Sequence, residues 1–137
     1  MIASARYVLD SYALLAYLGD EVGGKEVERL LRQAQRQRAQ LWLSIVSFGE
    51  VAYITERERS LEAAHRALAL IDRLPLQVVD ADRALTFAAA HVKASFSLAY
   101  ADAFAVALAR EVEARVVTGD PEFHLVESIV SVQWIGT

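Results

Sequence analysis

Apolar residues recur along the chain with two different spacings, and the two alternate from one end to the other. Short runs of branched and aromatic residues predict strands at 7–9, 41–43, 76–79, 115–118 and 130–134. Apolar residues three or four positions apart predict helices at 12–18, 25–38, 47–59, 61–74, 81–93 and from 95 or 97 to 113. Strands that alternate with helices are typical of a mostly parallel sheet with helices on both faces. We therefore expect residues 1–137 to form a single domain, a three-layer α/β/α fold with about five strands.

Small polar residues and glycine or proline predict where the helices begin and end. Gly19 suits the end of the first helix, and Pro75 stops the helix that begins at 61. Ser47 stands three residues before Glu50, which resembles a capping box, so Glu50 has a structural interpretation beside any functional one. The other predicted N-cap residues are Ser60, Asp80 with Asp82 as a second candidate, and Ser95 or Ser97.

The composition excludes several classes of protein. Hydrophobic residues make up 55% of the chain, yet no stretch approaches the ~20 uninterrupted apolar residues that span a bilayer. The N-terminus has no basic region followed by a long apolar core, so we expect a cytoplasmic protein without a membrane span. Cysteine is absent, which excludes disulfides and thiolate metal sites.

The net charge of −4 bears on possible partners. An acidic chain is not suited to binding a phosphate backbone unless it has a local basic patch or a bound cation. Arg29, Arg32, Arg36 and Arg38 follow one helix and are interpreted as a solvated face. The apolar surplus makes a second copy or another chain a plausible partner, with a groove around Leu14, Tyr17 and Leu18 as one hypothesis and an ordinary core as the other.

Two strands end in acidic residues. Asp10 follows the strand at 7–9, and Asp120 follows the strand at 115–118. Either acid taken alone is an ordinary turn or helix-capping residue. Ligands of open α/β sheets bind at the carboxyl ends of the strands, however, so both acids are expected at the edge where such a site would lie. Thr118 is placed to hydrogen-bond a neighbouring carboxylate.

Asp102 has no local explanation. Its neighbours three and four positions away are Leu98, Ala99, Ala105 and Val106, so it projects from an apolar helix face. A buried carboxylate there needs a cation, a donor or water, because an isolated buried charge is otherwise relieved by protonation. Glu50 and Asp102 both stand early in helices that start from the sheet edge of Asp10 and Asp120. Four carboxylates at one point repel, and a hard divalent cation with oxygen ligands is the usual remedy.

These acids also carry a resemblance to a known family. With the segments SLAYADAFA at 97–105 and VTGDPEF at 117–123, the chain resembles a PIN-domain ribonuclease of the VapC toxin type over essentially its whole length. The resemblance implies that Asp10, Glu50, Asp102 and Asp120 form an acidic metal site, with Thr118 and Ser11 in supporting positions. It assigns no role to any residue of 25–38.

What the resemblance implies about function is specific. It implies an endoribonuclease that depends on Mg²⁺ or Mn²⁺, is held inactive by a cognate VapB-like antitoxin and is commonly a homodimer. Metal-activated water would hydrolyse the phosphodiester bond and leave 5′-phosphate and 3′-hydroxyl ends. Neither a histidine nor a lysine is needed as a base.

Two other functions remain open from the sequence. An aspartyl phosphotransfer enzyme or receiver domain also has an acid after a parallel strand, but it needs a second acid two residues later or a lysine at a late strand end. Tyr12 and Thr118 occupy those positions here. A catalytically silent PIN-fold module that only binds a partner is disfavoured because all four acids are present.

Overall fold

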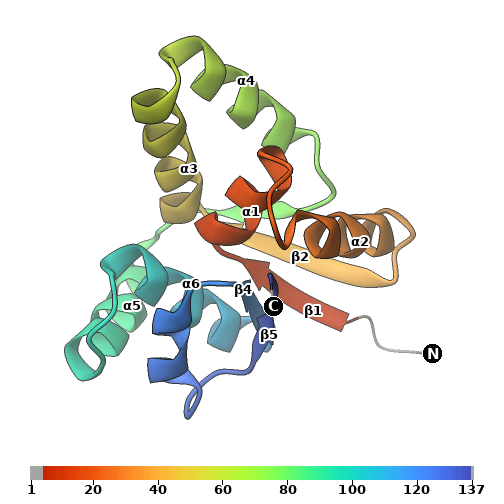
Figure 1. The fold of residues 1–137 in the computed structure, drawn as a ribbon. Coiled ribbons are helices and arrows are strands. Elements are labelled where there is room, and N and C mark those ends of the chain that lie inside the picture. Colours follow the sequence, from red (N-terminus) through yellow and green to blue (C-terminus); the bar gives the residue numbers. More distant parts are fainter. Residues whose placement is uncertain (1–4, 137) are drawn as a thin grey trace.

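The computed structural model describes residues 5–136. Its strands are β1 (Ala5–Leu9), β2 (Ala39–Ser44), β3 (Gln77–Val79), β4 (Arg115–Thr118) and β5 (Val132–Trp134). Its helices are α1 (Ser11–Leu18), α2 (Gly24–Gln35), α3 (Ile45–Glu58), α4 (Leu61–Asp72), α5 (Arg83–Ser95), α6 (Tyr100–Glu111) and the 3₁₀ helix η1 (Pro121–Val126). Helices lie on both sides of the sheet in Figure 1, which confirms the predicted three-layer fold.

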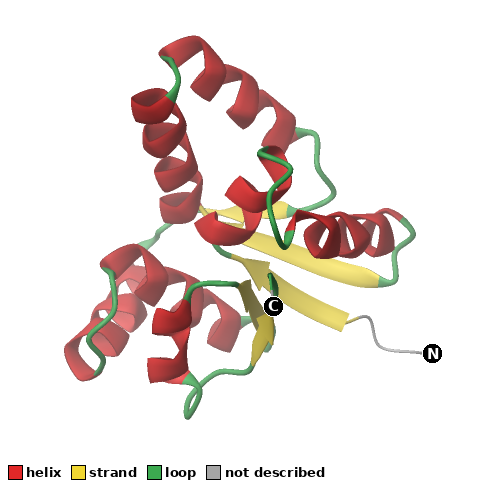
Figure 2. Cartoon of the chain, in the orientation of Figure 1, coloured by secondary structure: helices red, strands yellow, loops and turns green. Residues whose placement is uncertain are grey.

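The five described strands form one sheet in the order β3-β2-β1-β4-β5, and each neighbouring pair is parallel. The strands therefore all run in the same direction between the helices (Figure 2). β1 is the central strand, and Val8 pairs with Trp42 on one side and Val116 on the other. The chain builds the sheet outward from β1 in one direction and then returns to add β4 and β5 in the other. Because ligands bind where the strand order reverses, the carboxyl ends of β1 and β4 are the expected position for a site.

Alternate residues of the central strands face two separate cores. Val8 and Val116 pack with α5 and α6, whereas Leu9 and Val117 pack with α1 and α2. This is the alternation that a strand imposes, since successive side chains point to opposite faces of the sheet. All four residues are fully buried, so the register of β1 and β4 is set from both faces.

The alanine-rich helix α6 accounts for much of the apolar surplus. Every residue from Asp102 to Ala109 is buried, because α6 lies between the sheet and its neighbours α5 and α3. Small side chains allow a helix to be enclosed in this way. Leu14 is also fully buried in a core cluster, and Tyr17 and Leu18 are half-buried against it. The ordinary core, and not an open groove, therefore explains this apolar face of α1.

The structure confirms some predicted helix boundaries and corrects others. The Ser60 hydroxyl accepts from the Ala63 N–H at 3.0 Å and caps α4, and Gly19 is the C-cap of α1. The prediction for Asp80 was wrong, because Asp82 accepts from the Leu85 N–H at 2.8 Å and caps α5. The predictions for Ser95 and Ser97 were also wrong: Ser95 ends α5, and the N-cap of α6 is Ala99, which makes no side-chain capping bond.

The predicted capping box at Ser47 and Glu50 is likewise absent. Helix α3 begins at Ile45, two residues earlier than predicted, and its cap is Ser44, whose hydroxyl accepts from the Val46 N–H at 3.1 Å. Ser47 therefore lies inside the first turn, where it is buried. Because α3 begins earlier than predicted, Glu50 is not part of a capping box, and its carboxylate is available for another role.

The 3₁₀ helix η1 lies between β4 and β5 in the chain. Asp120 caps it by accepting from the Glu122 N–H at 2.9 Å. Within residues 5–136, no single helix is both long and apolar enough to cross a membrane; α5 and α6 meet that test only as a pair bent by 117°.

One helix contact leads to a stability prediction. A Cβ added at Gly24 would lie 2.6 Å from the Ala16 carbonyl oxygen, whereas a Cβ at Gly49 would meet no atom within 4 Å. Gly24→Ala should therefore lower the free energy of unfolding by about 1–3 kcal/mol, the usual cost of overpacking. Gly49→Ala, inside α3, should instead raise it by about 0.5–1 kcal/mol. Urea unfolding measures both, and equal effects of the two substitutions would contradict the helix contact.

Candidate metal centre

The first acid of the site is fixed by the start of α1. Asp10 follows β1 directly, and its Oδ1 accepts from the Ala13 N–H at 2.8 Å, which makes it the N-cap of α1. The Thr118 hydroxyl donates a second hydrogen bond to this carboxylate. Asp10 is only 2% exposed. Burial raises its pKa to about 7 against the effect of both hydrogen bonds, and the charges of Asp102 and Asp120 raise it further.

Thr118 links the ends of β1 and β4. Its hydroxyl oxygen accepts from the Asp120 N–H at 3.0 Å while its proton is donated to Asp10. Both of these acids are therefore held by one buried side chain. This is the role that the sequence predicted for Thr118.

Asp102 enters from the opposite layer. It is the third residue of α6 and is 8% exposed. Within residues 5–136, no side chain or backbone N–H donates a hydrogen bond to its carboxylate and no cation pairs with it. Burial raises the pKa of Asp102 to about 7, and the charges of nearby carboxylates raise it further, from Glu50, Asp120 and Glu122. Every charge that acts on this group is negative.

Glu50 is held by α1. The Ser11 hydroxyl donates to Glu50 Oε1 at 2.8 Å, so the first residue of α1 orients an acid from the second turn of α3. Glu50 is half-buried and acts electrostatically on Asp102. The other predicted supporting residue, Ser11, thus contacts the acidic group directly.

Three of the acids in this site show whether its residues fit a cation. One carboxylate oxygen from each of Asp102, Asp120 and Glu122 lies within 4.8 Å of the other two. Oxygen atoms at this spacing, supplied by carboxylates alone, form the donor set preferred by Mg²⁺ and Mn²⁺. Asp10 and Glu50 are outside this trio but are coupled to it electrostatically. The residues present therefore fit a hard divalent cation.

The four acids that the sequence singled out come from four different elements of the fold. Asp102 and Asp120 belong to the trio, and Asp10 and Glu50 act on it electrostatically. Asp10 comes from the end of β1, Asp120 from the end of β4, Asp102 from α6 and Glu50 from α3. Sequence reasoning missed Glu122, although it lies in the segment VTGDPEF, two residues after Asp120. The spacing of these two acids across the start of η1 was the available signal.

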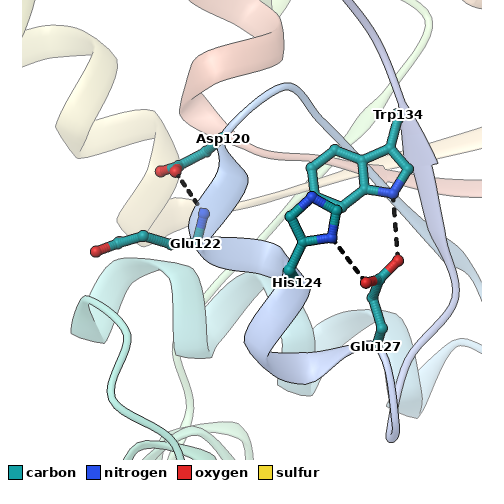
Figure 3. A network of polar contacts seen from close by, with 5 residues as sticks. All are labelled: Asp120, Glu122, His124, Glu127 and Trp134. Atoms are coloured by element: carbon teal, nitrogen blue, oxygen red, sulfur yellow. Dashed lines mark hydrogen bonds and ion pairs between the residues drawn. The ribbon is translucent and has the colours of Figure 1, made fainter.

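His124 does not belong to the acidic group. Its Nδ1 lies 2.8 Å from Glu127 Oε1, and its ring stacks on Trp134 with centroids 4.3 Å apart. Glu127 also accepts from the Trp134 indole N–H at 3.3 Å, and its pKa is lowered chiefly by the hydrogen bond with His124. Figure 3 shows these three side chains on one side of η1 and the carboxylates of Asp120 and Glu122 on the other. The partners of His124 are therefore Glu127 and Trp134, away from the acidic group.

Comparison with solved structures gives close matches to the fold. VapBC2 from Rickettsia felis, bound to a promoter DNA fragment, has a TM-score of 0.74 at 15% identity, covering 95% of this chain and 98% of that one. The sarcin-ricin-loop-cleaving toxin VapC20 from Mycobacterium tuberculosis has a TM-score of 0.70 at 19% identity, covering 93% and 98%. DNA-bound VapBC from Salmonella typhimurium has a TM-score of 0.69 at 17% identity, covering 94% and 97%.

Sequence comparison places the chain in a family. No curated protein sequence matches it. The family model described as the PIN domain, however, matches residues 7–128, a range that includes every acid of the candidate metal centre. The chain therefore belongs to the PIN domain family.

Proposed function

We propose that this protein is a divalent-metal-dependent endoribonuclease that acts as the toxin of a toxin-antitoxin pair. The observation that carries the proposal is Asp102, a buried carboxylate without a hydrogen-bond donor or cation among the described residues, surrounded by further carboxylates. Such a group is disfavoured as an anion, and a bound cation would favour its ionised form. An acidic pocket of this kind suits a metal ion that hydrolyses phosphodiester bonds.

The comparisons support the more specific parts of the proposal. Among the structural neighbours, one is described as cleaving the sarcin-ricin loop, and others are toxin-antitoxin complexes. By analogy, we assign RNA as the substrate and a VapB-like antitoxin as the partner, with a homodimer as the assembly and the cytoplasm as the compartment. These assignments rest on similarity of fold and family, and the acids of the site are what connect them to this chain.

The catalytic roles follow from the positions of the side chains. Asp102, Asp120 and Glu122 would hold the Mg²⁺ or Mn²⁺ ion, and Asp10 would complete the charge around it. The bound ion supplies Lewis-acid activation of water and stabilises negative charge on the phosphate oxygens. Thr118 orients Asp10, and Asp120 is oriented in turn through its own N–H.

Glu50 is suited to accept a proton. Ser11 occupies Oε1 of this carboxylate, which leaves Oε2 as the atom that can take a proton from the attacking water. Ser11 is therefore a positioning residue in this scheme, and Glu50 is the proposed base.

The first test replaces Asp102. Asp102→Asn should reduce Mn²⁺-dependent RNA cleavage by more than about 100-fold, because a ligand is lost from the centre that stabilises the transition state. The metal-free variant should be at least as stable as wild type at neutral pH, since the substitution removes a buried charge. Gel-based cleavage assays and thermal unfolding provide the two measurements. Cleavage at the wild-type rate by the folded variant would remove the proposed function.

A second test concerns Glu122, the acid that sequence reasoning missed. Glu122→Gln should weaken Mn²⁺ binding by about 10- to 100-fold, the range found when the surroundings of a metal site are altered. Glu111→Gln is the matched control, because it removes the same charge from an exposed residue at the end of α6. Isothermal titration calorimetry measures the affinities. Equal affinities of the two variants would exclude Glu122 as a ligand.

A third test uses pH. The pKa values of Asp10 and Asp102 are raised from 3.8 to about 7, so between these values the folded state holds protons that the unfolded state has released. Stability from this source is complete below pH 3.8 and is lost as the pH rises through 7. The melting temperature of the metal-free protein should therefore fall between about pH 5 and pH 8.

Two further measurements assign this fall to the acidic site. Asp102→Asn should reduce the slope, since one of the two groups no longer titrates. Mn²⁺ should raise the melting temperature more at about pH 8 than at pH 5, because protons and the cation compete for the same oxygens. A metal-free melting temperature that rises over this range would contradict the assignment.

A further inference from the structure

A basic surface on α2 has no role in the acidic site. Arg29, Arg32, Gln33, Arg36 and Arg38 line an open hollow of about 460 Å³ along this helix and the turn that follows it. A second hollow of about 250 Å³ shares Arg29 and Gln33 with the first, includes one acid, Glu26, and continues to Gln133 and Trp134 of β5. We call the two together the arginine groove.

The positive charges of the arginine groove stand close together, and their repulsion has an energetic cost. All four arginines are exposed, and no acid lines the outer hollow. Glu28 pairs with Arg32, but within residues 5–136 no hydrogen bond or ion pair engages the side chains of Arg29, Arg36 or Arg38. Arg32 is three residues from Arg29 and four from Arg36, spacings at which like charges on a helix repel. An ordinary solvated face places acids at these spacings, as Glu26 and Glu28 do for Arg29 and Arg32, but no acid stands three or four residues from Arg36 or Arg38. The charge at this end of α2 and in the turn after it therefore favours an anionic ligand.

The arginine groove extends toward the helix that carries two of the acids. Trp134, at its inner end, stacks on His124 of η1 with ring centroids 4.3 Å apart. The first turn of the same helix presents Asp120 and Glu122. As Figure 3 shows, the stacked rings lie on the other side of η1 from these carboxylates. A flexible polyanion could therefore pass around η1 from the acidic site into the groove.

We propose that the arginine groove binds the sugar-phosphate backbone of the RNA on one side of the scissile bond. This inference rests on the proposed function. The acidic site attracts phosphate only where a cation is bound and repels the flanking phosphates, so affinity for a long RNA must come from elsewhere on this acidic chain. Guanidinium groups match phosphate oxygens in geometry as well as in charge.

The surface fits RNA better than an acidic protein segment. Protein interfaces need buried apolar or aromatic anchors at their centre. The outer hollow is lined by arginine and glutamine alone, and the apolar and aromatic lining of the groove is confined to its inner hollow, at Tyr7, Leu30, Trp134 and Ile135. The outer hollow thus has charges without an apolar anchor, which is typical of backbone binding.

The test measures RNA binding without cleavage. Full-length protein in EDTA is titrated against a fluorescently labelled single-stranded RNA of about 20 nucleotides at several salt concentrations, because the slope of log affinity against log salt counts phosphate contacts at about 0.7 each. The combined variant Arg29→Ala, Arg36→Ala, Arg38→Ala should bind at least tenfold more weakly at low salt. Its slope should be smaller than that of wild type by about 2, the sum for three contacts.

Two controls make the result specific. Arg66→Ala, Arg73→Ala, Arg83→Ala removes the same charge from exposed residues on and beside α4 and α5, and it should leave the slope unchanged. Replacing Arg29, Arg36 and Arg38 by lysine should preserve most of the slope, since the charge remains. An equal loss in the alanine variants of both surfaces would overturn the proposal in favour of net charge, and unchanged RNA binding by the groove variant would overturn it in favour of a protein ligand.

The outcome is separable from that of the proposed function. Binding is measured without a metal, whereas the nuclease is tested by Mn²⁺-dependent cleavage. Absence of cleavage by wild type would count against the nuclease alone. The EDTA titration alone shows whether the arginines contribute to RNA binding, and its result does not depend on the cleavage assay.

Discussion

The repulsion between carboxylates at the end of the central strand is the constraint on which this structure depends. Asp10 and Asp102 are buried next to further acids, and burial together with like charge raises the pKa of each to about 7. The metal-free fold at neutral pH thus retains part of its stability by keeping protons on these groups. In the proposed metal site a divalent cation would replace those protons, so the same interaction that limits stability would create affinity for metal.

The topology explains how acids far apart in sequence reach one point. Because β1 is central and β4 joins it from the other direction, the carboxyl ends of the two strands are neighbours. Thr118 then ties Asp10 to Asp120, while α6 brings Asp102 from one face of the sheet. Parallel strands buried on both faces make this arrangement rigid, which is what a preorganised metal site requires.

The distribution of charge is consistent with a single substrate. In the proposed function, the acidic centre with its cation would engage one phosphate, and the basic surface on α2 would engage others along the same backbone. This division would allow a chain with a net charge of −4 to bind a polyanion. Trp134, which lines the groove, stacks on His124 of η1.

The sequence by itself determined the order of strands and helices, the parallel sheet and the sheet edge at which Asp10 and Asp120 lie, because alternating apolar periods and acids after strands are local signals. It named Asp82 only as the second candidate for the cap of α5, and it did not determine the caps of α3 and α6, which are Ser44 and Ala99. Packing decides which of several nearby polar residues begins a helix. The tertiary structure likewise decided that Glu122 joins the acidic site and that the arginines of α2 line a groove. Whether an exposed side chain joins a site depends on which distant elements the fold places beside it, and no local pattern contains that distance.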